Sequence, residues 1–126
     1  MIFWRSRGGR GASAAHRRDL DGRPIRHFGE EISDFADTAA LISLMDLVIS
    51  VDTSAAHLAG AMGKPVWILL SFFPDWRWLL DRDDSPWYPT AKLYRQHMPG
   101  AWDETIRRAA TDLFRIFGKK SVIRVD

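Results

Sequence analysis

The stretch Leu47-Val48-Ile49-Ser50-Val51-Asp52-Thr53-Ser54-Ala55-Ala56-His57 decides the fold class of this chain. Its first five residues form a continuous, mainly β-branched run, which is typical of a strand buried on both faces of a parallel sheet. Small residues with helical spacing follow immediately. The chain is therefore expected to pass from a buried strand into a helix within two or three residues.

The segments around this stretch repeat the same alternation. A helix is expected from Ser33 or Asp34 to about Met45, and a small-residue helix after Thr53 is closed by Gly63. Strand, helix, strand, helix, strand with short connections predicts right-handed crossovers and a parallel sheet covered by helices on both sides. The fold class is thus α/β, a Rossmann-like three-layer domain with a small parallel sheet. The further elements expected are strands at 24–28, 66–70 and 92–95 and a final amphipathic helix from Trp102 to Phe117.

Composition and charge divide the chain into three parts. Residues 1–22 are expected to be a flexible basic leader, residues 23–118 the folded domain, and residues 119–126 a tail. Residues 1–27 hold seven Arg against two Asp, whereas the remainder holds eleven Lys and Arg against fourteen Asp and Glu. Because the basic residues lie in the leader, a general nucleic-acid surface on the folded part is not expected. RNA binding through Arg7–Gly11 remains an alternative.

The whole sequence is consistent with one compact domain in a reducing compartment. Its 126 residues fit a single core, and it contains no Cys. It has no signal-peptide pattern and no apolar run near the ~20 residues of a membrane helix. We expect a cytoplasmic protein without a membrane span.

The junction between the second core strand and its helix is the expected binding site. Ligands of open α/β sheets bind at the carboxyl ends of the strands, and a helix N-terminus there favours an anion. Thr53 and Ser54 can offer hydroxyls and N–H groups to a phosphate, with His57 one turn further on. In the alternative interpretation, Asp52 or Thr53 only caps the helix and His57 packs against the sheet.

The long segment 71–90 is expected to be a functional loop. Arg77, between two Trp residues, is a candidate phosphate contact. Four aromatic residues of the loop could form a stacking platform, but we favour their packing on the sheet: Trp76, Trp78, Trp87 and Tyr88. Trp67 and Trp102 are expected in the core. Asp81-Arg82-Asp83 imitates a metal-binding Asp-x-Asp motif but is interpreted as a solvated turn, so no metal is predicted.

Several of these segments together resemble glycosyltransferase family 9, which includes the lipopolysaccharide heptosyltransferases. The resemblance spans roughly residues 24–117 and is carried by 34–42, 46–53, 57–61 and 63–67. Residues 75–82 and 85–90 are more narrowly similar to bacterial proteins in which tetratricopeptide repeats precede a family-9-like region.

The resemblance implies the C-terminal, donor-binding half of a GT-B glycosyltransferase fold. In that family an Asp-Thr-Gly-x-x-His sequence holds the nucleotide sugar, which implies donor contacts for Asp52, Thr53, Ser54 and His57, with Ser54 where the heptosyltransferases have Gly. The nucleotide-diphosphate sugar would be the donor substrate, and no cofactor is implied.

The acceptor domain, which carries the family's proposed catalytic carboxylate, is not recognisable in this chain. We therefore expect hexosyl or heptosyl transfer only when an N-terminal acceptor or tetratricopeptide-repeat domain of a longer protein is present, and we assign no catalytic residue. The alternative is a non-enzymatic nucleotide-binding or protein-interaction module.

Overall fold

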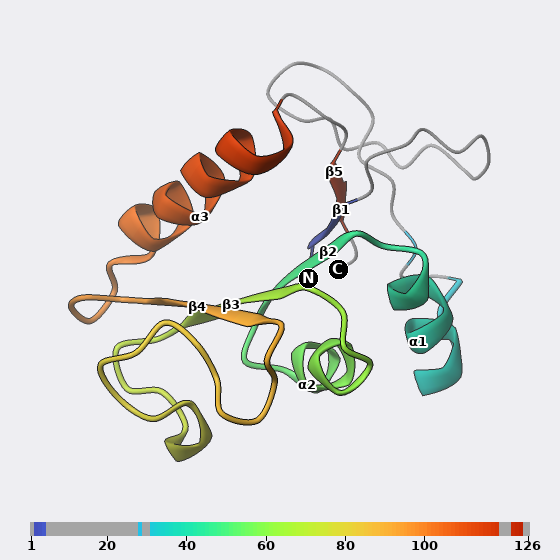
Figure 1. The fold of residues 1–126 in the computed structure, drawn as a ribbon, viewed down its shortest axis with the longest axis horizontal. Coiled ribbons are helices and arrows are strands. Elements are labelled where there is room, and N and C mark those ends of the chain that lie inside the picture. The colour runs from blue at the N-terminus through green and yellow to red at the C-terminus, as the bar shows by residue number, and fades with distance from the viewer. Residues whose placement is uncertain (1, 5–27, 29–30, 119–121, 125–126) are drawn as a thin grey trace.

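The structure, a computed structural model, describes residues 2–4, 28, 31–118 and 122–124. They form a five-stranded sheet in the order β4-β3-β2-β1-β5 with helices on both faces (Figure 1). Three strands pair in parallel: β2 (Leu47–Val51), β3 (Val66–Leu70) and β4 (Ala91–Arg95), the last at one edge of the sheet. The Rossmann-like α/β fold expected from the alternation of elements is therefore confirmed.

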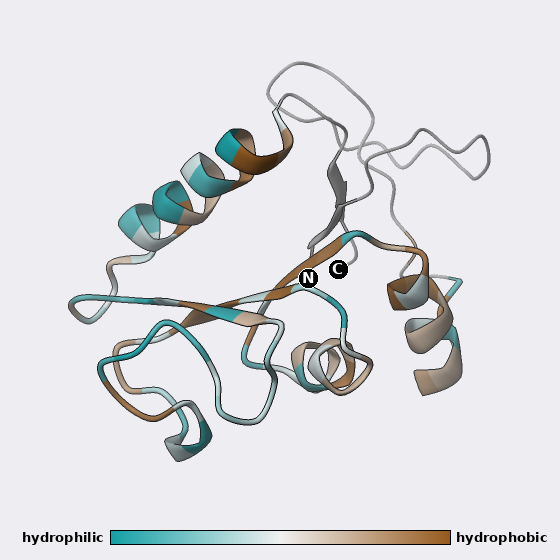
Figure 2. Ribbon diagram, in the orientation of Figure 1, coloured by the Kyte–Doolittle hydropathy of each residue, from teal (hydrophilic) through white to brown (hydrophobic). Residues whose placement is uncertain are grey.

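The continuous apolar runs of these strands are explained by burial on both faces. On one face, Val48, Val66 and Ile68 pack in a cluster with α1 (Phe35–Ser43) and α2 (Ser54–Ala61). On the other face, Leu47 and Trp67 pack with α3 (Trp102–Phe117). Hydrophobic colour follows β2 and β3, whereas α3 alternates between hydrophilic and hydrophobic residues (Figure 2). This three-layer arrangement leaves the carboxyl ends of β2, β3 and β4 at one edge of the sheet.

Local sequence signals set the helix boundaries. Asp34 caps α1, because its carboxylate accepts from the Asp37 N–H at 2.9 Å. Two glycines in the left-handed region follow the other helices: Gly63 (φ 68°) comes after α2 and Gly118 (φ 66°) directly after α3. The predicted boundaries of α3, β2 and β3 match the structure.

Two short antiparallel strands differ from the sequence expectation. β1 (Ile2–Trp4) pairs antiparallel with β2, and β5 (Val122–Arg124) pairs antiparallel with β1, whereas the sequence placed both segments outside the folded domain. A strand of three residues is too short to carry a recognisable period, and its pairing is set by partners far away in the chain. The rest of the leader, the strand expected at 24–28 apart from Phe28, and most of the tail lie outside the described residues.

No helix among residues 31–118 is long and apolar enough to cross a bilayer.

Burial at the centre of the sheet predicts a large stability difference between two Leu/Ile positions. Ile68 is fully buried in β3, whereas Leu80 is 73% exposed. Ile68→Ala should lower the free energy of unfolding by about 2–5 kcal/mol, because it leaves a cavity between packed layers. Leu80→Ala should change it by less than about 0.5 kcal/mol. Urea unfolding followed by circular dichroism measures both, and equal losses would contradict the assigned core.

Candidate functional site

The N-terminus of α2 lies at the carboxyl end of β2 and keeps its backbone donors free. Thr53 is the N-cap residue, but its hydroxyl lies 3.0 Å from the buried Ser50 hydroxyl and makes no capping bond to the helix. Within the described part of the chain, the N–H groups of Ser54 and Ala55 have no acceptor. This end of α2 therefore offers an exposed, partially positive site for an anion.

His57 lies one turn into α2 and has both ring nitrogens occupied. Its Nδ1 is 2.9 Å from the Tyr88 hydroxyl, and its Nε2 is 3.3 Å from Oδ1 of Asp52. The ring also stacks on Trp78, with 5.1 Å between centroids and 26° between planes. His57 thus joins the end of β2 to the long loop that follows β3.

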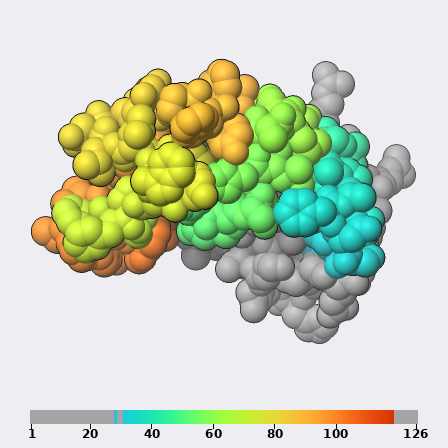
Figure 3. Space-filling model, turned by 90° about the horizontal axis from the view of Figure 1, so that it is seen from below, coloured from blue at the N-terminus to red at the C-terminus, as the bar shows by residue number. Residues whose placement is uncertain are grey.

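The loop 71–90 is folded down beside α2 (Figure 3). It contains η1 (Trp76–Trp78), whose last residue is fully buried in the core cluster with α1 and α2. The Tyr88 ring packs against this cluster, at a place where Gly60 of α2 has no side chain to obstruct it. The expectation that the loop aromatics pack is correct for Trp78 and Tyr88, but Trp76 and Trp87 are 69% and 57% exposed.

A partly buried cation anchors this loop to the sheet. The Arg95 guanidinium at the end of β4 donates to the carbonyl oxygens of Arg82, at 2.8 Å, and Trp78. Burial lowers the pKa of Arg95. No local signal in the sequence indicates this role, because a single Arg at the end of a strand is usually a solvent-exposed residue.

Arg77 lies on η1, apart from the four other predicted site residues. Its guanidinium is 2.8 Å from the Asp75 carboxylate and 5.1 Å from the Trp76 ring centroid. The pKa of Asp75 is lowered first by the backbone N–H of Arg77 and also by the charge of His57. The 3₁₀ turn is therefore within electrostatic reach of His57, although Arg77 itself contacts its own loop.

The remaining sequence expectations have mixed outcomes. Trp67 is buried as expected, whereas Trp102 is only half-buried. In the Asp81-Arg82-Asp83 segment, the Arg82 guanidinium forms a bidentate ion pair with the carboxylate of Asp84, the residue that follows the segment. Within residues 31–118, no three His, Asp or Glu side chains gather as a metal site would require.

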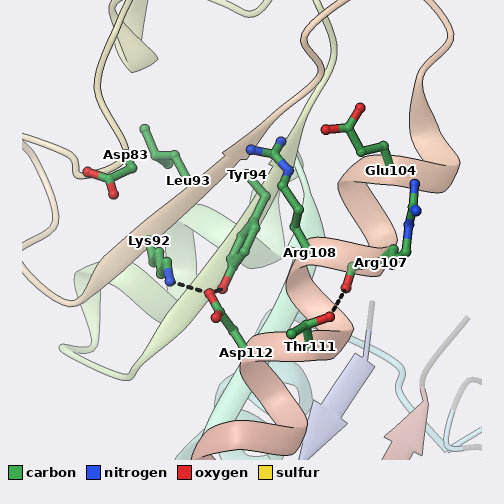
Figure 4. Close-up of a pocket in the computed structure, with 9 residues that line it drawn as sticks. All are labelled: Asp83, Lys92, Leu93, Tyr94, Glu104, Arg107, Arg108, Thr111 and Asp112. Carbon is green, nitrogen blue, oxygen red and sulfur yellow. Dashed lines mark hydrogen bonds and ion pairs between the residues drawn. The ribbon is translucent and has the colours of Figure 1, made fainter.

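A separate cavity of about 690 Å³ lies between β4 and α3, with Asp83 at its rim (Figure 4). None of the predicted site residues lines it. Asp112 accepts from Lys92 at 2.5 Å and from the Tyr94 hydroxyl at 2.9 Å, and these bonds lower the pKa of Asp112. The charges of Lys92 and Asp112 in this cavity are thus paired with each other.

The open helix end beside a parallel strand and the loop next to it lie at the carboxyl edge of the sheet, which is where ligands of Rossmann-like α/β domains commonly bind. Residues 33–71, from α1 to β3, match the model of glycosyltransferase family 9 (heptosyltransferase). The resemblance to that family is confirmed over this segment, which contains Asp52, Thr53, Ser54 and His57, and the segment is glycosyltransferase-like.

The similarity to one curated relative extends over more residues than the match to the family model. The chain is 36% identical over 81 residues to Protein FlbA of Caulobacter vibrioides, a match that covers 64% of this chain and 13% of that protein. The chain thus corresponds to a small part of this relative. No solved structure matches the chain significantly.

The close approach of Tyr88 to α2 predicts an unusual response at Gly60. A Cβ on Gly60 would lie 2.5 Å from Cγ of Tyr88, so Gly60→Ala should destabilise the protein by about 1–3 kcal/mol. In a Tyr88→Ala background the same substitution should be neutral, or stabilising by up to about 1 kcal/mol, because Ala favours helices over Gly. Urea unfolding of the four proteins tests this, and equal effects in both backgrounds would exclude the contact.

Proposed function

We propose that this chain binds a nucleoside-diphosphate sugar as the donor-binding part of a GT-B glycosyltransferase-like protein. The observation that carries the proposal is the open N-terminus of α2 within the segment that matches glycosyltransferase family 9. Helix N-termini at the carboxyl edge of parallel sheets are frequent binding sites for the phosphates of nucleotides.

In this proposal the diphosphate lies over the first turn of α2. The N–H groups of Ser54 and Ala55 donate to its oxygens, and the exposed Ser54 hydroxyl adds a further donor. Thr53 orients the turn through its bond to Ser50. His57 and Asp52 border the diphosphate, and Arg77 meets the outer part of the donor if it leaves Asp75.

The isolated chain should bind the donor without transferring the sugar. A leaving diphosphate can be stabilised by the turn at Thr53, but the acceptor hydroxyl also needs a base. We propose that this base is supplied by an acceptor domain, or a tetratricopeptide-repeat part, of a longer protein. The length of the relative, of which the match covers 13%, supports such an organisation.

Binding and helix stability should respond in opposite directions to one substitution. Ser54→Asp places a negative charge in the first turn of α2, which should stabilise the protein by about 0.3–1 kcal/mol through the helix dipole. The same charge should weaken binding of ADP and UDP at least about tenfold by repelling the diphosphate. Amide shifts at 53–57 in NMR titrations measure binding, and urea unfolding measures stability.

A matched control is available in α1. Ala36 is an exposed residue in the first turn of that helix, so Ala36→Asp adds the same charge away from the site and should leave nucleotide affinity unchanged. Its effect on stability should be smaller, because Asp34 and Asp37 already lie at the start of α1. If the wild-type amides at 53–57 do not move at millimolar ADP or UDP, the proposed donor site is wrong. Unchanged affinity in Ser54→Asp would place the diphosphate elsewhere.

Transfer activity distinguishes an incomplete enzyme from a binding module. Supplying a candidate acceptor domain in trans should restore hydrolysis or transfer of the nucleotide sugar, as detected by release of nucleoside diphosphate. A matched reaction with the Ser54→Asp chain should remain near background. If no nucleoside diphosphate is released although the chain binds nucleotide, a non-enzymatic binding module is favoured.

A further inference from the structure

The imidazole of His57 has no ring nitrogen left for a ligand in this arrangement. Its Nε2 faces the Asp52 carboxylate at 3.3 Å, and its Nδ1 faces the Tyr88 hydroxyl at 2.9 Å. A carboxylate can only accept, so this contact is favourable in the tautomer that carries its proton on Nε2. In the neutral ring Nδ1 then accepts from Tyr88, whose hydroxyl can also turn round and accept if the ring is charged.

Tyr88 reaches His57 from a position 31 residues further along the chain. Its ring meets that of His57 edge-on, with centroids 5.7 Å apart, and lies against the open surface of Gly60. Trp78 stacks on the imidazole, and the Trp78 ring centroid is 6.2 Å from that of Tyr88. His57 is thus flanked by two aromatic residues of the loop and bonded to a hydroxyl of the same loop, while 32% of its side chain stays exposed.

We infer that Tyr88 is a positioning residue, whose hydroxyl holds the His57 imidazole in the orientation that keeps Nε2 against Asp52. Asp52 is adjacent to the N-cap residue of α2, where its negative charge would oppose a diphosphate. An imidazole N–H aimed at this carboxylate occupies it and offsets part of its charge. The conformation of the loop is thereby coupled to the anion-binding strength of the turn.

The effect on nucleotide binding rests on the proposed function, whereas the orientation of His57 does not. Tyr88→Phe removes one oxygen and preserves the ring that fills the space beside Gly60. Without the hydroxyl, Nδ1 loses its partner and the imidazole can turn between rotamers. Nucleotide affinity should then fall about fivefold, the value of one neutral hydrogen bond.

The experiment combines imidazole ¹⁵N NMR of the full chain with ADP and UDP titrations. In Tyr88→Phe, the His57 Nδ1 resonance should move toward that of a nitrogen without a hydrogen bond, and Nε2–H should exchange faster with water. Tyr94→Phe is the matched control, because it removes a hydroxyl that bonds Asp112 on the opposite face of the sheet. It should leave the His57 resonances and the dissociation constants unchanged.

Each outcome has a defined meaning. An unchanged Nδ1 resonance in Tyr88→Phe would overturn the inference. An altered resonance with unchanged nucleotide affinity would support the positioning of His57 by Tyr88 and overturn its coupling to nucleotide binding. If the wild type binds neither nucleotide, the proposed function fails, and the ligand-free ¹⁵N spectra still decide whether Tyr88 holds His57. If Tyr88→Phe does not fold, the ligand-free wild-type chain decides: a His57 Nδ1 resonance at the position of a nitrogen without a hydrogen bond would contradict the inference, and a hydrogen-bonded Nδ1 resonance would support it.

Discussion

The passage from β2 into α2 is the constraint on which the rest of the structure depends. β2 is buried on both faces through its first four residues, so its polar backbone must be satisfied by strands on either side. The chain can leave the sheet only where β2 ends, at the carboxyl edge, and there Thr53 is the N-cap residue of α2. Because β3 and β4 run in the same direction, their carboxyl ends lie at that edge too. The loops at this edge are therefore brought to the first turn of α2 by topology alone.

The long loop after β3 is held in place by side-chain hydrogen bonds, mainly from the Arg95 guanidinium, and contains little regular secondary structure. Segment 71–90 has little regular hydrogen bonding, yet its aromatic residue Trp78 is fully buried. Arg95 satisfies two of its carbonyl groups, and Gln96 accepts from the N–H groups of Phe72 and Gly100. These bonds replace the ladder that the loop lacks and hold Trp78 and Tyr88 over His57.

The sequence predicts the strands and helices whose signal is local, and these include β2 and α2, which carry most of the candidate site residues. Five apolar residues at 47–51 are sufficient to indicate a buried strand, and small residues from Ala55 indicate the helix that follows. Asp52 directly precedes the N-cap residue of α2 and His57 lies one turn into the helix, so the two residues are neighbours in the local chain. The bond between His57 and Tyr88 could not be predicted, because it depends on how the loop folds. Gly60 is the nearest local sign, since a glycine within a helix often marks a close approach by another segment. The short strand β1 is likewise defined only by its distant partners.

The two helices on the same face of the sheet differ in a way that stability alone does not explain. Asp34 caps α1, and Ser33 with Asp37 completes a reciprocal set of bonds at its start. At α2, Thr53 is a residue type well suited to capping, but its hydroxyl is directed to Ser50. A missing side-chain cap costs about 1 kcal/mol. A domain selected only for stability would gain by turning this hydroxyl to the helix. A diphosphate accepting from the same N–H groups would recover that energy on binding, so the open turn is consistent with a helix end whose capping group is the ligand.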